Sequence, residues 1–360
     1  MAAQHVYGLW GERVGKAKPG FSKQGPSARQ IRPAIVRAIR PLASLALLCI
    51  ACISPSQGVE PIQTRNHRAF SLAFLRVPAR ISVLPKGASE WSLGWTQAND
   101  LRRSEGKGGT IEEDYEVFRL AGVYRRGLGG GWEIAAEAPF LSRDGGFMDP
   151  IIEWWHENVL RWISGLRAAT PHNVHLLRMP NGREFDAASG LGDVSLFASK
   201  QLCGEWVGTI GLKLPTGDAG DLLGSGSVDF GATITGARRL GGRWHGAAQF
   251  GLVAQGKARK LGRTRSWADQ ELLMLAWAPN SRDVWIVQWQ SEAAALRSRI
   301  PDSDAPHRLI TFGYKRKLSA RETLELFFSE DRDLFDGRFP EGANIGPDFT
   351  AGIRYEVRAK

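Results

Sequence analysis

The chain contains repeated segments in which apolar and polar residues alternate. In Trp206–Leu214, apolar or small residues occupy every second position and the intervening positions include Lys213. Near the C-terminus, Phe349–Val357 repeats the pattern with Arg354 and Glu356 at polar positions. Such alternation is typical of β-strands whose two faces meet different surroundings. It fits a soluble sandwich with a buried apolar face, and equally a membrane barrel whose apolar face meets lipid.

The beginning of the chain favours export and therefore the membrane barrel. An apolar run, Pro41–Ser54, follows Arg37 and Arg40. It is shorter than the roughly 20 residues that a membrane-spanning helix needs, and it matches the short apolar core of a secretion signal. We expect residues 1–58 to be a basic leader with this signal. Residues 1–35 are then either an extension from a misassigned start codon or a disordered basic tail.

The net charge does not indicate a nucleic-acid partner. The formal charge is +10, but residues 1–58 hold eight lysines and arginines and one acid, so +10 minus +7 leaves +3 for the rest. No basic stripe remains of the kind that nucleic-acid binding requires. Cys203 is the one cysteine after the expected leader, so disulfides cannot hold the fold.

Short turns alternate with longer polar segments along the chain, which is the arrangement of outer-membrane barrels. We predict about twelve antiparallel strands (range 10–14) within residues 89–360 as one domain. They are Ser89–Asn99, Glu113–Arg125, Trp132–Leu141, Gly192–Leu202, Glu205–Pro215, Val228–Leu240, Arg243–Ala254, Ala268–Ala278, Asp283–Glu292, His307–Lys317, Arg321–Glu330 and Pro347–Arg358. Ala69–Arg80 also reads as a strand but would make the number odd. We therefore assign residues 59–88 to an N-terminal segment that is inserted or periplasmic.

Tryptophans mark one end of this predicted barrel. Trp132, Trp206, Trp244 and Trp285 each follow closely after a short turn. Four tryptophans at one height are typical of the aromatic girdle at a membrane surface. Tryptophans in the core of a soluble sandwich would have no reason to gather there.

The longest loop contains a predicted amphipathic helix, Asp149–Ile163. Asp149 is a candidate N-cap with Pro150 at the first helical position. Glu153 and His156 share a face at a spacing compatible with a metal, but no distant third ligand can be identified, and we predict no metal site. Because the helix is rich in tryptophan, we expect it to dock on the rim, inside the mouth or against lipid.

Several charged residues fall at inward positions of the predicted strands. Asp193, Lys213, Asp229 and Arg239 are expected to pair across the lumen and fix its width, or to line a permeation path. Asp218 lies in a Gly/Asp-rich turn. The predicted lumen and gate residues are Asp149, Glu153, Trp155, His156, Asp193, Lys213, Asp218, Asp229 and Arg239.

Five motifs, in this order, carry a resemblance to a known family. They are Trp95-Thr-Gln-Ala-Asn99, Asp114-Tyr-Glu-Val-Phe118, Gly145-Gly-Phe-Met-Asp-Pro-Ile-Ile-Glu-Trp-Trp-His156, Gly190-Leu-Gly-Asp-Val194 and Lys213-Leu-Pro-Thr-Gly-Asp218. From about Glu60 to the C-terminus, the chain resembles the bacterial family called domain of unknown function family 3187. The resemblance implies an outer-membrane β-barrel of Gram-negative bacteria without an established activity. The Gly-Asp-Val and Leu-Pro-Thr-Gly-Asp segments are also similar to those of outer-membrane transporters associated with phenol degradation.

The sequence thus predicts an all-β protein, an antiparallel transmembrane barrel with one long helical loop. Our first hypothesis is a narrow or loop-gated channel for passive transport of a small solute. A structural or adhesion barrel with partner-binding loops is the alternative. A membrane-embedded hydrolase is a third, although no nucleophile motif accompanies any histidine. The expected partners are outer-membrane lipid, the barrel assembly machinery and an unidentified solute; no cofactor and no catalytic residue are predicted.

Overall fold

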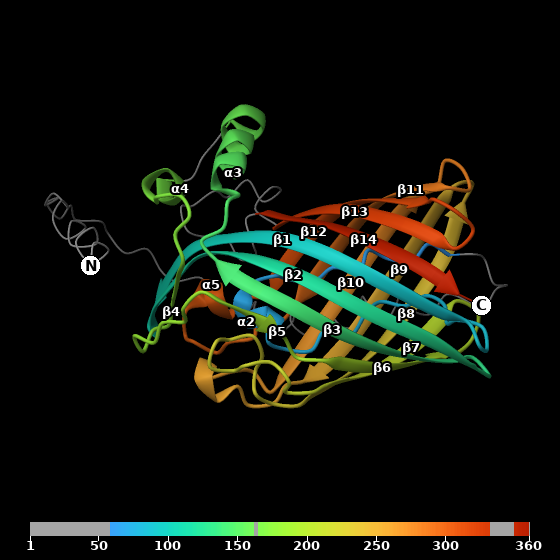
Figure 1. Cartoon of the computed structure of the whole chain (residues 1–360), viewed down its shortest axis with the longest axis horizontal. Coiled ribbons are helices and arrows are strands. Elements are labelled where there is room, and N and C mark those ends of the chain that lie inside the picture. The colour runs from blue at the N-terminus through green and yellow to red at the C-terminus, as the bar shows by residue number, and fades with distance from the viewer. Residues whose placement is uncertain (1–57, 162–164, 332–348, 360) are drawn as a thin grey trace, which may run out of the picture. The chain divides into compact units, whose positions relative to one another are not determined.

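The computed structural model describes residues 58–161, 165–331 and 349–359. These residues form a closed antiparallel barrel of twelve strands, with few helices. Strand β1 (Ser89–Gly106) closes the ring by pairing with β14 (Phe349–Ala359), from Ser89 opposite Ala359 to Asn99 opposite Phe349. Figure 1 shows the strands inclined around the barrel axis. The predicted fold class is confirmed.

The other ten strands of the ring follow one another in chain order, each pairing with its neighbours. They are β2 (Gly109–Gly129), β3 (Trp132–Asp144), β6 (Ser195–Gln201), β7 (Trp206–Lys213), β8 (Asp229–Gly241), β9 (Trp244–Ala254), β10 (Trp267–Trp277), β11 (Asp283–Glu292), β12 (His307–Lys317) and β13 (Glu322–Asp331). Two short strands extend the sheet at its margin: β4 (Leu176–Arg178) pairs with β2, and β5 (Ala188–Leu191) pairs with β3. Their positions leave the twelve-stranded ring unchanged.

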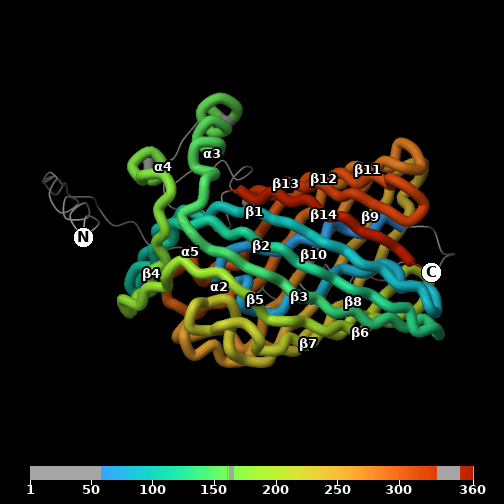
Figure 2. The backbone as a smooth tube through the Cα atoms, viewed as in Figure 1, coloured from blue at the N-terminus to red at the C-terminus, as the bar shows by residue number. Residues whose placement is uncertain are grey.

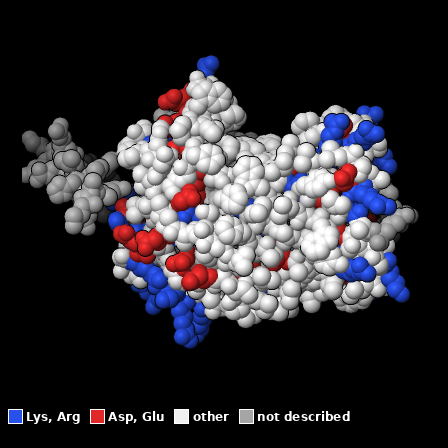
Figure 3. Space-filling model, viewed as in Figure 1, with Lys and Arg blue, Asp and Glu red and all other residues white. Residues whose placement is uncertain are grey.

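The alternation read from the sequence separates the outside of the barrel from the lumen. On β14, Arg354 is buried and donates to Ser92 Oγ on β1 at 2.8 Å, whereas Tyr355 and Val357 are exposed. Exposed apolar side chains form a band around the wall: Leu93, Leu196, Ile210, Phe230, Leu252, Leu273, Leu275, Val287, Phe312 and Leu326. In Figure 3, charged side chains gather toward the two ends of the barrel, with a largely uncharged band between them. This is the surface of a barrel that spans a membrane.

The two ends of the barrel differ, as the turns predict. Short turns join β2 to β3, β6 to β7, β8 to β9, β10 to β11 and β12 to β13, and we call this side the short-turn end. The exposed Trp132, Trp244 and Trp285 lie there. At the opposite, long-loop end, β1 and β2 continue past the predicted strand ends Asn99 and Glu113 as a hairpin that reaches Gly106 opposite Gly109. Within it, the Tyr115 hydroxyl donates to Asp100 at 3.0 Å.

Residues 58–88 lie inside the barrel, and we call them the plug (Figure 2). The backbone of Ile62 bonds to Gln288 on β11, that of Leu75 bonds to Asp229 on β8, and that of Leu84 bonds to Glu133 on β3. The plug therefore rises from the short-turn end, reverses near helix α2 (Ala69–Leu72) and returns. The strand-like pattern of Ala69–Arg80 thus reflects an extended segment packed in the lumen, with a helical tip, and no additional strand of the wall.

Small helices lie at the long-loop end. In the loop after β3, α3 (Asp149–Trp155) continues into the π-helix η2 (His156–Leu160), and α4 (Gly165–Ala169) follows. A 3₁₀-helix, η3 (Arg259–Leu261), lies between β9 and β10, and α5 (Pro301–Asp304) lies between β11 and β12. No helix within the described residues has the length and apolar character to cross a membrane.

Candidate functional site: the plugged lumen

Inward-facing glutamines hold the backbone of the plug. Gln288 Oε1 accepts from the N–H of Ile62 at 3.0 Å, and its Nε2 donates to the Ile62 carbonyl at 3.1 Å. Gln270 holds Val77 in the same way, accepting at 3.1 Å and donating at 2.7 Å. Each amide thus completes the hydrogen bonds of one buried plug residue that has no neighbouring strand. We call these two contacts the glutamine clamps.

Glycines in the wall make room for the plug. A Cβ atom at Gly313 on β12 would lie 2.6 Å from Ile62 Cδ1, and one at Gly231 on β8 would lie 2.8 Å from Val77 Cγ2. Both distances are shorter than carbon atoms tolerate without displacement. The two clamped plug residues therefore each sit against a wall position that lacks a side chain.

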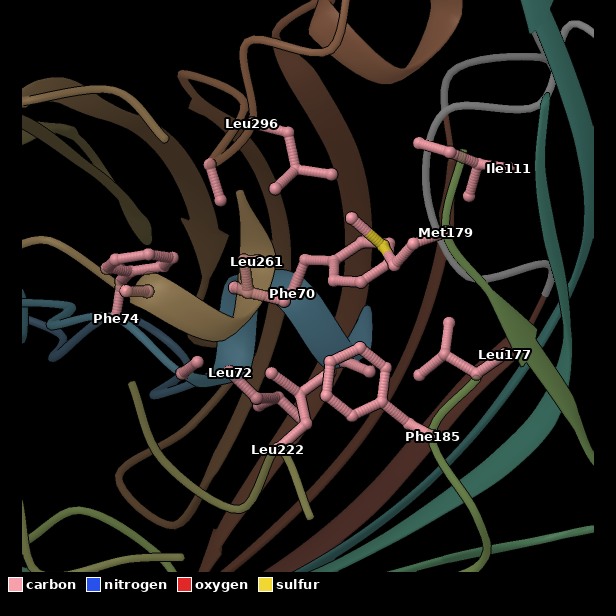
Figure 4. Close-up of a cluster of buried hydrophobic side chains, with 14 of the residues drawn as sticks. Phe70, Leu72, Phe74, Ile111, Leu177, Met179, Phe185, Leu222, Leu261 and Leu296 are labelled. Carbon is pink, nitrogen blue, oxygen red and sulfur yellow. The ribbon is translucent and has the colours of Figure 1, made fainter. Parts of the chain in front are cut away.

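The tip of the plug closes the long-loop end of the lumen. Arg68 is paired with Glu113 of β2 at 2.5 Å, both side chains being almost completely buried. The hydroxyl of Tyr115 accepts from the N–H of Ala69 at 2.9 Å. Around α2, apolar side chains of the plug, the wall and the outer loops pack together (Figure 4), and we call this group the apolar cap: Phe70, Leu72, Phe74, Ile111, Leu177, Met179, Phe185, Leu222, Leu261 and Leu296. The cap excludes water from this end of the barrel.

A buried lysine joins the wall, the plug and a loop. Lys213 Nζ lies 2.5 Å from Asp193 Oδ2 and 3.5 Å from Asp229 Oδ2. It also donates to Ser225 Oγ at 2.7 Å, in the loop after β7. Asp229 in turn accepts from the N–H of Leu75 in the plug at 2.8 Å. The predicted charges at 193, 213 and 229 therefore meet, but they pair along neighbouring strands near the long-loop end and not across the lumen.

A cavity of about 60 Å³ remains between the plug and the wall, mainly beside β1, β2, β3, β13 and β14, with Phe197 of β6 and Leu272 of β10 also in its lining. Its lining includes Arg65, His67 and Arg80 from the plug and Arg119, Arg354 and Phe327 from the wall. A water molecule needs roughly 10–15 Å³ of such space, so the cavity holds several waters or one small solute. In the part of the chain that the structure describes, no group of three or more histidines, cysteines and acidic residues is arranged to hold a metal ion.

Comparison with protein-family models shows which family the chain belongs to. Residues 42–336 match the family model described as "Protein of unknown function (DUF3187)". The chain belongs to this family. This agrees with the five motifs in the sequence. A search among curated proteins gives no match.

Solved structures similar to this DUF3187 barrel are outer-membrane proteins. A COG4313 outer membrane channel from Pseudomonas putida F1 aligns with a TM-score of 0.51 at 14% identity, covering 79% of this chain and 100% of that one. The NanC porin aligns at 0.39 with 7% identity, covering 75% and 98%. The toluene transporter TodX from P. putida aligns at 0.35 with 11% identity, covering 81% and 91%. The first of these three supports the barrel fold.

The helical loop of this DUF3187 barrel lies against the outside of the wall. Trp155 contacts Phe328 of β13, with ring centroids 6.2 Å apart. Phe328 lies on the outward side of β13, because the neighbouring residues Phe327 and Ser329 face the lumen and are buried. Asp149, the first residue of α3, does not cap the helix, since Met148 holds the N-cap position.

The polar residues of this loop also have partners outside the lumen. Asp149 Oδ1 pairs with Arg167 at 2.5 Å and accepts from Asn99 of β1 at 3.1 Å. Asn99 is an outward residue, so the loop covers polar groups on the outer wall that lipid could not satisfy. Glu153 pairs with His172 at 2.8 Å, and His156 follows Trp155 at the end of α3. The expectation that Asp149, Glu153 and Trp155 line the lumen is therefore corrected. The role of His156 and a gating role of the helix stay predictions.

Two other predicted lumen residues lie at the ends of the barrel. Arg239 is exposed and donates to the carbonyl of Gly242 at the short-turn end, with the shorter contact at 2.6 Å. Asp218 accepts from the N–H of Gly220 at 2.5 Å within its turn. Both side chains thus bond within local turns, Arg239 near the end of β8 and Asp218 in the loop between β7 and β8.

One histidine connects the outer loop to the wall. Arg143 Nε of β3 donates to His175 Nε2 at 3.3 Å, and Arg143 also donates to the carbonyl of Asp186 at 2.9 Å. Burial and the positive charge of Arg143 lower the pKa of His175 below its usual range. His175 is therefore neutral at pH 7, which its role as an acceptor requires.

Proposed function

We propose that the protein is an outer-membrane channel for passive transport of a small solute, and not an enzyme. The observation that carries the proposal is the non-covalent plug with a cavity beside it. The wall and the plug are joined by ion pairs and hydrogen bonds such as the glutamine clamps. Contacts of this kind can open and reform without unfolding the barrel. The outward apolar band would meet lipid, and the short-turn end would face the periplasm.

The position of the cavity supports transport beside the plug. It lies beside β1, β2, β3, β13 and β14, where Gly94 has no side chain and Thr96 has a small one. Twelve strands enclose more space than the eight-stranded barrels that side chains fill, and less than the wide sixteen-stranded porins. We infer a narrow channel whose long-loop end is closed by the apolar cap until the plug tip moves.

The apolar cap favours the alternative, a structural barrel. Phe70, Leu72 and the surrounding side chains fill the long-loop end as a protein core does. If this core never opens, the barrel serves as an anchor for its outer loops. The two proposals differ in whether the plug tip leaves its position.

Liposome swelling tests the proposal. Proteoliposomes that contain the full-length protein should swell in isotonic solutions of solutes smaller than about 200 Da and not in those of disaccharides, as expected for a lumen narrower than a porin's. Liposomes with heat-denatured protein are the control. Swelling no faster than that of the control for every solute would favour the structural barrel.

A further inference from the structure

The cavity beside the plug is lined mainly by cationic groups. Five arginines face it, with Glu137 as the one carboxylate of its described lining. They are Arg65, Arg76 and Arg80 from the plug and Arg119 and Arg354 from the wall. Because the arginines come from both the plug and the wall, the positive groups lie on more than one side of the cavity.

Three of these arginines are neutralised by direct pairing. Arg119 pairs with Glu137 of β3, and Arg76 pairs with Glu292 of β11. Arg354 Nε lies 3.0 Å from Glu356 of β14. The charges of Arg65 and Arg80 remain.

Neither of the remaining arginines has a carboxylate in contact among the described residues. Arg65 Nη2 donates to the carbonyls of Ser71 and Phe74, each at 2.7 Å, and its Nε is buried without a partner. Arg80 is 4% exposed. Glu60 attracts Arg80 at longer range, but the Glu60 carboxylate accepts from Ser82 at 3.2 Å instead. Two carboxylates act on each of these charges at longer range, Glu137 and Glu292 on Arg65 and Glu60 and Glu133 on Arg80. Together with the carbonyl dipoles they offset the two buried charges only in part.

A buried histidine, His67, faces the same cavity. His67 is 2% exposed, and neither ring nitrogen has a hydrogen bond of normal geometry with a described residue. A neutral imidazole has one N–H to donate. Leaving buried polar groups without partners costs free energy, as does leaving buried charges without counter-charges. A ligand that satisfies them must accept hydrogen bonds and carry negative charge.

We propose that this cavity, which Arg65, His67 and Arg80 line, binds a small monovalent anion, a carboxylate or a halide. A cavity of about 60 Å³ accommodates an ion of this size and excludes larger ones. The inference rests in part on the proposed channel function, because it assigns small organic anions as the class of solute that passes. The anion site itself requires only the plug and the wall.

Bromide provides a direct probe of binding. Crystals of the full-length protein soaked in sodium bromide should show an anomalous peak in the cavity, and the double variant Arg65→Gln/Arg80→Gln should lose it. Unchanged gel mobility of the unboiled variant shows that the barrel is folded. A wild-type cavity without bromide overturns the inference, whether or not the protein conducts.

Ion selectivity tests the assignment of the solute. In planar bilayers with an approximately tenfold KCl gradient, the reversal potential should show a preference for chloride, and the double variant should reduce the chloride-to-potassium permeability ratio by about threefold or more. Arg259→Gln/Arg282→Gln removes the same charge from exposed positions and should leave the ratio unchanged. Conduction without any chloride preference overturns the assignment of anions as solutes. A bromide peak without conduction supports the anion site and contradicts the channel proposal.

Discussion

The side-chain amide of Gln288 holds both backbone hydrogen-bonding groups of Ile62, at 3.0 and 3.1 Å. A glutamine of the wall thus replaces a neighbouring strand for a segment that has none. Gln270 and Val77 repeat the relationship on the returning half of the plug. The glutamine clamps bond to the plug backbone, so they fix the position of the plug largely independently of the plug's side chains.

Removing one clamp should loosen the plug without disturbing the wall. Gln288→Leu leaves the N–H and carbonyl of Ile62 buried and unpaired, at a cost of about 1–3 kcal/mol. We expect faster amide hydrogen exchange at Ile62, measured by mass spectrometry of peptides from residues 58–66. Thr311→Val is the control, because the Thr311 hydroxyl bonds to Ser329 on the neighbouring strand at 2.7 Å, a contact within the wall. Equal exchange in both variants would show that the clamp does not hold the plug.

Filling a wall glycine should displace the plug by steric contact. Valine at Gly313 places its side chain where Ile62 Cδ1 lies, and overpacking of this kind costs about 1–3 kcal/mol. Strand β12 itself tolerates valine, because β-branched residues favour strands. Limited proteolysis should then cleave within residues 58–75 in the variant and not in the wild type. Gly246→Val, at a position outside the plug contacts, provides the comparison.

The buried ion cluster around Lys213 should stabilise the barrel. Lys213→Met leaves the buried Asp193 and Asp229 without their counter-charge and should destabilise the barrel by about 3–5 kcal/mol. The temperature at which the folded band disappears in unboiled gel samples measures this loss. Lys200→Met removes a lysine at the short-turn end that donates to the carbonyl of Gly130, and it should have a much smaller effect. Equal effects would mean that the buried ion cluster contributes nothing specific.

Acid should loosen the outer loop through His175. Its pKa is lowered in the folded protein, so the unfolded loop takes up the proton first as the pH falls below about 6.5. The free energy that the neutral histidine contributes to the stability of the folded loop is therefore complete above this pH. It decreases as the pH falls further, until the histidine of the folded form is protonated as well. Proteolysis within residues 145–190 should accelerate between about pH 7 and pH 5. His175→Gln keeps an acceptor for Arg143 and should remove most of this dependence; an unchanged pH profile would contradict the role of His175.

The architecture could be predicted from the sequence because each strand has one environment along its outer face and another along its inner face. Lipid on one side and a packed lumen on the other impose a period of two, as Arg354 and Tyr355 show on β14. The same period misled the interpretation of residues 69–80. There the alternation comes from an extended plug whose Leu75 and Val77 pack against the wall, while Ala69–Leu72 forms a helix.

The site could be predicted only in part. Lys213 and Asp229 meet because they are facing positions of neighbouring strands, and Asp193 joins them from the segment just before β6. The wall residues Gln270 and Gln288 carried no charge or motif that would draw attention. Their inward position in a predicted strand was the one available signal. The position of Trp155 depended on which surface of the barrel the loop covers, and periodicity within the loop contains no information about that surface.

Single-channel conductance tests the central claim that a movable plug controls a narrow channel. The wild-type protein and the double variant Gln270→Leu/Gln288→Leu should be compared in planar bilayers under the same salt. We predict small, infrequent openings for the wild type, and larger or more frequent openings for the variant, whose plug has lost both clamps. Conductance that is the same for the two proteins, or absent from both, would contradict the account.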